Sequence, residues 1–394
     1  MARKRRSKRF RKDFFDKYDY STLESTSPVC SHFGLCGGCR FQNITYDSQL
    51  QLKKDYLKNI FGEDVNIVSS KNPFGYRNRM DFVYDKGVLG LRKRGDFRTV
   101  IDIDDCFLIP DQFKEIFFFV KNSLKEKNIP SYNIDSQEGF LRYVVFRFAP
   151  STGEVMLILT SKSPKDDSEK KLFENFLILL SEKVDSVYWF VNDELTDISI
   201  PYNNYFKVFG KKTITEKFGD VNLSFGPQSF FQANSLMSEI VFNKIKSFVK
   251  GEVFDLCCGV GAIGLFVADA VKSVCGLDSV SSAIDFAKLN AKNNSVSNAI
   301  FFSDDMKNLL DYSPLNLDTL IVDPPRAGLG NKVLKRILEL KPQRIIYMSC
   351  NPKTQKIDLD ILLKDNLYKQ VFLEAYDMFS QTSHLESLLV LDLV

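Results

Sequence analysis

A cysteine and a carboxylate near the end of the chain have the residue types that nucleophilic catalysis requires. Cys350 ends an apolar run in the segment MSCNP, and Glu386 opens the last apolar run in the segment HLE. A strand cysteine is usually a small apolar packing residue. A cysteine at a strand end that Pro352 terminates would instead face the edge at which parallel sheets bind ligands. We therefore expect Cys350 to act as a nucleophile and Glu386 as a proton acceptor.

A glycine-rich segment at residues 254–264, FDLCCGVGAIG, has the pattern of a strand, a tight turn and a helix start. Such a turn brings the backbone close to a ligand at the positive end of a helix. A dinucleotide enzyme could share this pattern. The acidic strand, the later DPP segment and a closing antiparallel strand pair favour S-adenosylmethionine. The candidate contacts are Cys257, Gly259, Gly261, Asp278, Asp304 and Asp323.

A thiol beside a methyl donor indicates a particular reaction. Carbon 5 of a pyrimidine is too weak a nucleophile to accept a methyl group until a thiolate adds to carbon 6. A base must then remove the surplus proton from carbon 5 before the thiolate leaves. Cys350 and Glu386 fit these two roles, and Asp323 could polarise the pyrimidine.

A second group of cysteines lies early in the chain. Cys30, Cys36 and Cys39 are closely spaced, and Cys106 follows much later. Four thiolates suit either zinc or an iron–sulfur cluster, so spacing alone leaves both open, together with unrelated free thiols.

Four separate segments resemble the RNA 5-methyluridine methyltransferase family. They are SFFQAN at 229–234, DPPRAG at 323–328, SCNP at 349–352 and HLE at 384–386. The similarity runs from about Cys30 to Val394, and the family contains both tRNA T-loop enzymes and 23S ribosomal RNA enzymes. The resemblance implies that Cys350 is the nucleophile and Glu386 the base.

The same resemblance implies the remaining ligands. Gln232, the residue at Cys257, Asp278 and Asp323 would contact S-adenosylmethionine or the target base. Relatives usually have an aromatic residue at the Cys257 position, so a backbone contact is expected there. The segment HFGLCGGCRFQ resembles the family's iron–sulfur segment, which favours a [4Fe–4S] cluster on the four early cysteines. Many relatives also have an N-terminal β-barrel RNA-binding domain, which we do not expect in the short segment before Cys30.

The elements that must position these residues divide the chain into three parts. Residues 1–20 form a basic tail that we expect to be disordered. Residues 28–212 contain a short amphipathic helix at 47–61 and then a β-rich stretch with turn signals, which indicate an α+β RNA-binding domain that holds the cluster. In residues 213–394 short apolar strands alternate with helices. This pattern predicts a Rossmann-like, doubly wound α/β methyltransferase sheet with an antiparallel final strand.

Composition and charge are consistent with an intracellular, cytoplasmic protein. The 394 residues contain no apolar run of bilayer length and no secretory signal, so we expect no membrane partner. Eight of the 53 Lys and Arg residues lie within residues 1–12, which contain no Asp or Glu. Such a block attracts polyanions. We expect a monomer.

Basic and aromatic residues alternate in the β-rich stretch and suggest an RNA-binding surface. The cations are Arg77, Arg79, Lys86, Arg92, Lys93, Arg94 and Arg98, and the aromatic residues are Tyr76, Phe82, Tyr84 and Phe97. Phe230 or Phe231 could wedge beside a flipped uridine, although a core role is equally open. The favoured activity is C5 methylation of a uridine in tRNA, in preference to 23S rRNA. The alternatives are an RNA-binding or chaperone protein and a cytosine-C5 methyltransferase.

Overall fold

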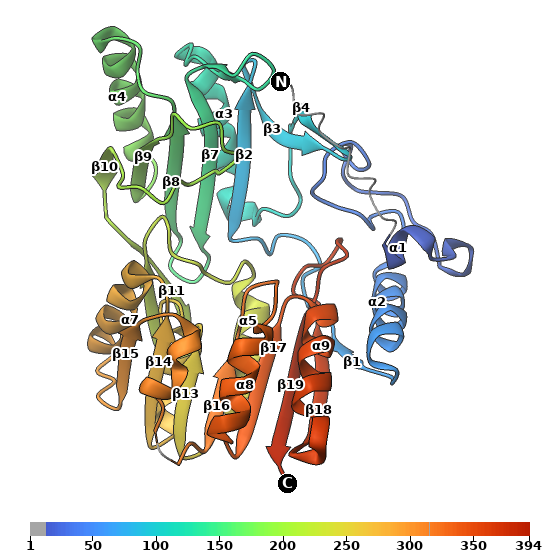
Figure 1. Cartoon of the computed structure of the whole chain (residues 1–394). Coiled ribbons are helices and arrows are strands. Elements are labelled where there is room, and N and C mark those ends of the chain that lie inside the picture. The colour runs from blue at the N-terminus through green and yellow to red at the C-terminus, as the bar shows by residue number, and fades with distance from the viewer. Residues whose placement is uncertain (1–12, 315) are drawn as a thin grey trace, which may run out of the picture.

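A mostly parallel sheet forms the C-terminal half of the chain in the computed structural model, which describes residues 13–314 and 316–394 (Figure 1). The strand order is β1-β18-β19-β17-β16-β13-β14-β15. In that order, the strands span Asn66–Val68, Tyr368–Tyr376, Glu386–Leu393, Arg344–Ser349, Thr319–Val322, Glu252–Leu256, Ser273–Asp278 and Ala299–Ser303. The predicted doubly wound sheet is therefore present.

Both faces of this sheet are covered by helices because its strands are apolar on both sides. Val253 of β13 packs with α5 (Ser235–Lys246), α6 (Ala262–Val267) and α7 (Ser281–Asn293). Its neighbour Phe254 points to the opposite face and packs with α8 (Gly330–Leu340) and α9 (Pro352–Leu362). Successive residues of a strand point to opposite faces, so a continuous apolar run builds both layers.

The edge of the sheet departs from the parallel pattern in two ways. β19 runs antiparallel between β17 and β18, as expected. β1, from the N-terminal part of the chain, then pairs in parallel with β18. Helix α2 (Tyr46–Phe61), which matches the expected amphipathic helix, leads into β1 and packs beside α9.

A second sheet forms the middle of the chain and lies above the first in Figure 1. Its main order is β10-β9-β8-β7-β2-β3-β4, with bounds Lys207–Gly210, Ser186–Val191, Glu154–Ser161, Leu141–Ala149, Arg79–Asp85, Val88–Lys93 and Asp96–Asp102. The short strands β5 (Tyr132–Asn133) and β6 (Glu138–Gly139) pair beside β2. Pairing is antiparallel except for β8 with β9 and β2 with β5.

One core joins the two halves. Helices α3 (Lys114–Glu126) and α4 (Asp167–Ser181) pack against one face of the central sheet. On the other face, Val145 and Ile158 share a core with Phe218 and Phe225 of the hairpin β11–β12 (Ile214–Phe218 and Val221–Phe225) and with Val253 of the C-terminal sheet. The hairpin therefore connects the sheets by apolar packing.

The expected domain limits need two corrections. Residues 13–20 were assigned to a disordered tail, but they contain α1 (Phe14–Lys17), whose Phe15 is buried against Tyr56 of α2. Arg40 also forms ion pairs with Asp13 and Asp16. Residues 46–68, assigned to the central domain, belong to the C-terminal sheet through β1. Residues 1–12 lie outside the described part. No helix in the described ranges has the length and apolar character needed to cross a membrane.

Candidate active site

Cys350 lies in a tight turn between the buried strand β17 and helix α9. The turn is held by Ser349, whose hydroxyl accepts a hydrogen bond from the Asn351 N–H at 3.1 Å, and Pro352 begins the helix. The Asn351 amide donates to the Arg326 carbonyl at 2.9 Å and so ties this turn to the loop after β16. Cys350 is half-buried, as a nucleophile that must meet a substrate requires.

Glu386 is brought to Cys350 by the strand register. Ser349 of β17 is paired with Ser387 of β19 in an antiparallel ladder, so the next positions outward are Cys350 and Glu386. Glu386 is only 3% exposed, and its Oε2 has no hydrogen-bond partner among the described residues. Burial raises the pKa of Glu386 well above its usual range, and the Asp323 charge adds to the rise. A buried carboxylate with an unused acceptor suits a proton acceptor.

Asp323 follows β16 on the same edge of the sheet. Its carboxylate accepts a hydrogen bond from the Gln232 amide at 3.0 Å. Burial raises the pKa of Asp323 to about 7, although this hydrogen bond opposes the rise. Gln232 is itself held from the central sheet, because Asn78 donates to its carbonyl at 2.7 Å. Two predicted residues from distant segments thus form one polar pair.

Arg326 is a further site residue, in the DPPRAG segment that follows β16. Its guanidinium lies 2.9 Å from Nδ1 of His384. Burial lowers the pKa of His384 to about 4, with help from Arg326, so the ring is neutral and accepts this bond. Burial raises the pKa of Cys350, the Glu386 charge adds to the rise, and Arg326 opposes it. Arg326 is therefore the cation that favours the thiolate.

The glycine turn after β13 lines a small recess at the carboxyl ends of the strands. Asp278, at the end of β14, accepts the Gly259 N–H at 3.0 Å. Cys257 has a left-handed backbone (φ 67°) and its N–H donates to the Leu277 carbonyl at 2.8 Å. A pocket here is lined by the predicted residues Gln232, Cys257, Gly259 and Asp323, and by Asp255. A contact between Asp278 and a cofactor ribose stays a prediction.

Two further acidic residues near this edge, Asp255 and the predicted Asp304, have hydrogen-bond partners within the protein. Asp255 lies within β13, is buried, and caps α6 by accepting the Gly264 N–H at 2.9 Å, while its Oδ1 has no partner in the described structure. Burial raises its pKa to about 7. Asp304 accepts a hydrogen bond from the Tyr312 hydroxyl at 2.8 Å and is not part of the pocket lining. Its contact with a cofactor stays a prediction.

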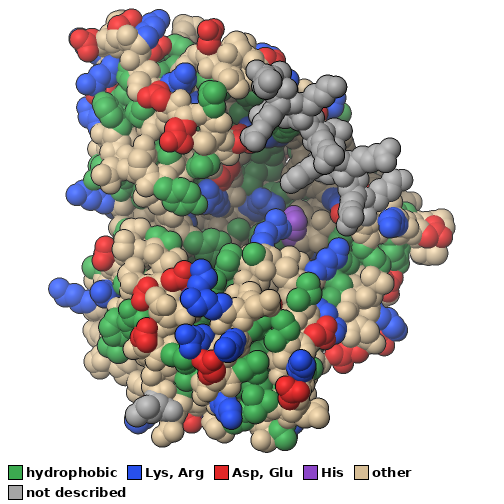
Figure 2. Space-filling model, in the orientation of Figure 1, with side chains coloured by type: hydrophobic (Ala, Val, Ile, Leu, Met, Phe, Trp, Pro, Cys, Tyr) green, Lys and Arg blue, Asp and Glu red, His purple; other side chains and the backbone are tan. Residues whose placement is uncertain are grey.

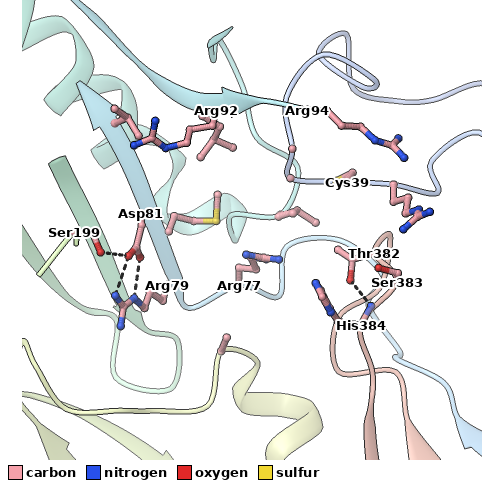
Figure 3. A pocket seen from close by; sticks show the side chains of 18 of the residues that line it. Cys39, Arg77, Arg79, Asp81, Arg92, Arg94, Ser199, Thr382, Ser383 and His384 are labelled. Atoms are coloured by element: carbon pink, nitrogen blue, oxygen red, sulfur yellow. Dashed lines mark hydrogen bonds and ion pairs between the residues drawn. The ribbon is translucent and has the colours of Figure 1, made fainter. Parts of the chain in front are cut away.

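A basic cleft of about 720 Å³ lies between the two sheets and ends beside the site. Figure 2 shows the molecule hollowed there, with Lys and Arg side chains around the opening. Figure 3 shows Arg77 of the central part beside Thr382 and His384 from the loop before β19, whereas Arg79 turns toward Asp81. The two halves of the chain thus supply opposite walls of one cleft.

The cleft selects among the predicted RNA-binding residues. Four of the seven predicted cations line it, but Lys86, Lys93 and Arg98 do not, and Arg40 is an addition. Arg79 and Arg92 are paired with Asp81 and Asp197, respectively. Arg77 has a buried Nε without a partner among the described residues. The seven cations lie close together in the sequence, but in the folded sheet only some of them face the cleft.

Most of the predicted stacking residues are core residues. Tyr76, Phe82 and Tyr84 are buried, whereas Phe97 is 62% exposed. The adjacent phenylalanines before α5 differ in the same way. Phe231 is stacked on Phe225 with ring centroids 4.2 Å apart, but Phe230 is 68% exposed at the rim of the recess.

The charges of the four early cysteines affect one another. All are free thiols, and the pKa of Cys106 is raised to about 11, first by burial and then by Cys36 and Cys30. The pKa of Cys39 is raised to about 12 by burial, with added effects of Cys106 and Cys36. Within the described ranges, however, no three His, Cys, Asp or Glu side chains are arranged to hold a metal ion. The cluster therefore stays a prediction.

Comparisons with known proteins agree with this geometry. Residues 220–394 match the family model described as tRNA (uracil-5-)-methyltransferase. The tRNA (uracil(54)-C(5))-methyltransferase of Pyrococcus furiosus is 36% identical over 92% of this chain and 86% of its own length. An RNA methyltransferase of Nanoarchaeum equitans without an assigned target is 34% identical over 94% and 81%. The crystal structure of Pyrococcus abyssi tRNA (uracil-54, C5)-methyltransferase with S-adenosyl-L-homocysteine has a TM-score of 0.79 and 36% identity, and covers 91% of this chain and 86% of that one.

Proposed function

Because the chain belongs to the tRNA (uracil-5-)-methyltransferase family, we propose that it methylates carbon 5 of a uridine in the tRNA T loop, the uridine at position 54 as in its Pyrococcus relatives. One observation carries this proposal. The strand register places a half-buried thiol, Cys350, next to a buried carboxylate with a free acceptor, Glu386. The alternatives of an RNA chaperone and a cytosine-specific enzyme have no observation in their favour.

S-adenosylmethionine, when bound, supplies an electrophilic methyl group. The recess after β13 is the proposed site, with Asp278 on the ribose and the backbone of Cys257, Gly259 and Gly261 around the ligand. Gln232 and Asp323 line this recess and form a hydrogen-bonded pair there. Asp304 is proposed at the adenine end of the cofactor. Its carboxylate would become available to the adenine if the Tyr312 hydroxyl, which now donates a hydrogen bond to it, turned away.

The chain's own residues carry the reaction on the uracil ring. The Cys350 thiolate adds to carbon 6, which makes carbon 5 a nucleophile toward the methyl group. Asp323, whose pKa is raised to about 7, can hydrogen-bond the polar edge of the ring. Glu386 then takes the proton from carbon 5, the double bond re-forms and the thiolate leaves. The raised pKa of Glu386 makes its ionised form a stronger proton acceptor.

The basic cleft is proposed as the RNA path to this site. Arginines suit the phosphates of a folded RNA, and the target uridine must leave its stack to reach Cys350. Phe230 is exposed at the rim of the recess and can stack on the displaced base or its neighbour.

A 5-fluorouridine RNA tests the mechanism because fluorine on carbon 5 cannot be removed as a proton. We expect wild-type protein, S-adenosylmethionine and such a tRNA transcript to give a covalent complex on a denaturing gel, and Cys350→Ala to give none. Glu386→Gln should still form it, but should release no product from ordinary uridine RNA. Normal turnover by Glu386→Gln would contradict the assigned base. A matched 23S rRNA fragment tests the choice of tRNA.

We also propose that Cys30, Cys36, Cys39 and Cys106 bind a [4Fe–4S] cluster. The support is chemical: all four are free thiols, Cys36 and Cys106 are buried, Cys30 and Cys39 are half-buried, and their charges act on one another. Methyl transfer involves no net oxidation or reduction, so the role of the cluster would be structural. Iron in anaerobically purified protein is the direct measurement, and stoichiometric zinc in its place would refute the assignment.

A further inference from the structure

A buried lysine lies on the inner face of α2, outside the proposed active site. The side chains of Lys53 and Asp377 are both 0% exposed, and they form an ion pair. The remaining two N–H groups of the Lys53 ammonium donate to the carbonyl of Phe379 at 3.3 Å and to the carbonyl of His384 at 3.0 Å. An ammonium has three donors and no acceptor, so every donor of Lys53 is in use.

The carboxylate of this pair is equally well satisfied. Asp377 accepts the Tyr46 hydroxyl at 2.7 Å and the Ser380 hydroxyl at 2.8 Å. The Tyr46 oxygen in turn accepts the Ser70 N–H at 2.7 Å. A buried ion pair often stabilises a fold no better than apolar residues of the same size, because both charges lose their hydration. Stability alone is therefore a poor reason for this network, and the geometry it imposes is a better one.

The network holds the loop 377–385, which connects β18 to β19 and ends at Glu386. Further restraints come from both halves of the chain: Asn234 donates to the Met378 carbonyl at 3.0 Å and Arg326 bonds His384, while two others come from the N-terminal part. The Gln381 carbonyl accepts the Arg40 N–H at 2.7 Å, and Gln49 bonds the Gln381 side chain at 3.0 Å. Gln381 has a left-handed backbone (φ 68°), a conformation that persists only where its surroundings hold it. The bond nearest to Glu386 is the one from Lys53 to His384.

Cys350 has a separate set of supports. Its turn is held by Ser349 and Asn351 and by the Arg326 loop, and none of these contacts involves Lys53. The turn of Cys350 is therefore held without Lys53, and Arg326 is the contact that links this turn to His384 in the loop before Glu386.

We propose that Lys53 is a positioning residue for proton removal, which holds the His384 carbonyl and thereby aims Glu386 at carbon 5 of the target uridine. This inference rests on the proposed function. In the step concerned, the bond from carbon 5 to hydrogen breaks and the proton passes to the Glu386 carboxylate. The electrons of that bond form the carbon 5–carbon 6 double bond, and the carbon 6–sulfur bond breaks to return the Cys350 thiolate.

The test separates attack from release with the full-length protein. Adduct formation on 5-fluorouridine tRNA reports the attack and methyl transfer, which do not need Glu386. Turnover on ordinary tRNA reports the complete cycle. For Lys53→Met we expect unchanged adduct formation, turnover slowed by about 10–100-fold as for a displaced catalytic group, and accumulation of a covalent protein–RNA complex on ordinary uridine RNA.

Two further variants make the result decisive. In Lys53→Met, the Asp377 charge is left buried without a partner and could destabilise the fold. The double variant Lys53→Met/Asp377→Leu removes both charges and avoids this effect. We expect the double variant also to accumulate the covalent protein–RNA complex. Lys54→Met changes the exposed neighbour on α2 and should match wild type. Normal turnover of either Lys53 variant, or equal losses in adduct formation and turnover, would overturn the proposal. Failure of wild-type protein to form the fluorouridine adduct would instead refute the proposed function.

Discussion

The thiol of Cys350 experiences two opposing charges at the scale of single residues. Burial and the Glu386 carboxylate raise its pKa, whereas the Arg326 guanidinium lowers it. The thiol is therefore protonated at rest, and Arg326 is the group that makes the reactive thiolate accessible.

This arrangement predicts a pH dependence. Because the pKa of Cys350 lies above its ordinary value, the rate of adduct formation should increase with pH across the neutral and mildly alkaline range. Arg326→Met removes the opposing cation and raises the pKa further. Each rise of one in that pKa lowers the thiolate fraction at neutral pH about tenfold. The rates of adduct formation by the two proteins between pH 6 and 10 check this, and an equal loss at every pH would show that Arg326 acts in some other way.

The sequence was informative about residues whose roles follow from local motifs. Cys350, Glu386 and Asp323 could be placed because each follows or opens an apolar strand at the ligand-binding edge. Arg326 and Lys53 could not be assigned from the sequence, because the partner that they share, His384, is distant in the chain. It lies 58 residues from Arg326 and 331 residues from Lys53. On α2, Lys53 is one lysine among several, and only packing shows which one is buried.

At the scale of elements, one buried arginine fixes the loop that carries Gln232. Arg147 of β7 is 2% exposed and donates to the carbonyls of Gly226 and Ser229, both at 2.8 Å, and of Pro227 at 3.2 Å. The central sheet therefore shapes one wall of the cofactor recess. All nine residues of β7 are buried, so its two arginines do not face solvent.

Replacement of this arginine should weaken both the fold and the recess. Each buried carbonyl that loses its donor costs about 1–3 kcal/mol. We expect Arg147→Met to lower the free energy of unfolding by about 3 kcal/mol or more in urea, and to weaken binding of S-adenosyl-L-homocysteine measured by calorimetry. The exposed Arg98→Met is the matched control for stability. Unchanged binding in folded Arg147→Met would show that the loop keeps its shape without this support.

At the scale of the whole molecule, the basic cleft exists only because the two sheets meet. The sequence predicted a cationic ribbon and a methyltransferase sheet separately, and gave no means of seeing that His384 and Thr382 would face Arg77 across a shared cavity. Inter-sheet packing through β11–β12 decides that arrangement, and it depends on contacts between distant segments.

RNA affinity should therefore depend on salt through the cleft arginines. Each phosphate contact that is removed lowers the steepness of the salt dependence by about one in a plot of log affinity against log salt. We expect Arg77→Met and Arg94→Met each to weaken tRNA binding with this reduction, without a change in affinity for S-adenosyl-L-homocysteine. Filter binding at several salt concentrations measures it, with the exposed Lys183→Met as control. An unchanged slope in both variants would move the RNA path elsewhere.

The pairing of β1 with β18 has a consequence for how the chain reaches its folded state. β1 leaves the ribosome among the first elements of the protein, but the strand with which it pairs, β18, is among the last. Contacts across so many residues carry a large loop-closure cost and slow the folding reaction. Lys53 of α2, the helix before β1, likewise pairs with Asp377, which follows β18 directly. The loop 377–385, which leads to Glu386, therefore takes its final form only after synthesis is nearly complete. A chain that ended before β18 would lack both Glu386 and the strand with which β1 pairs.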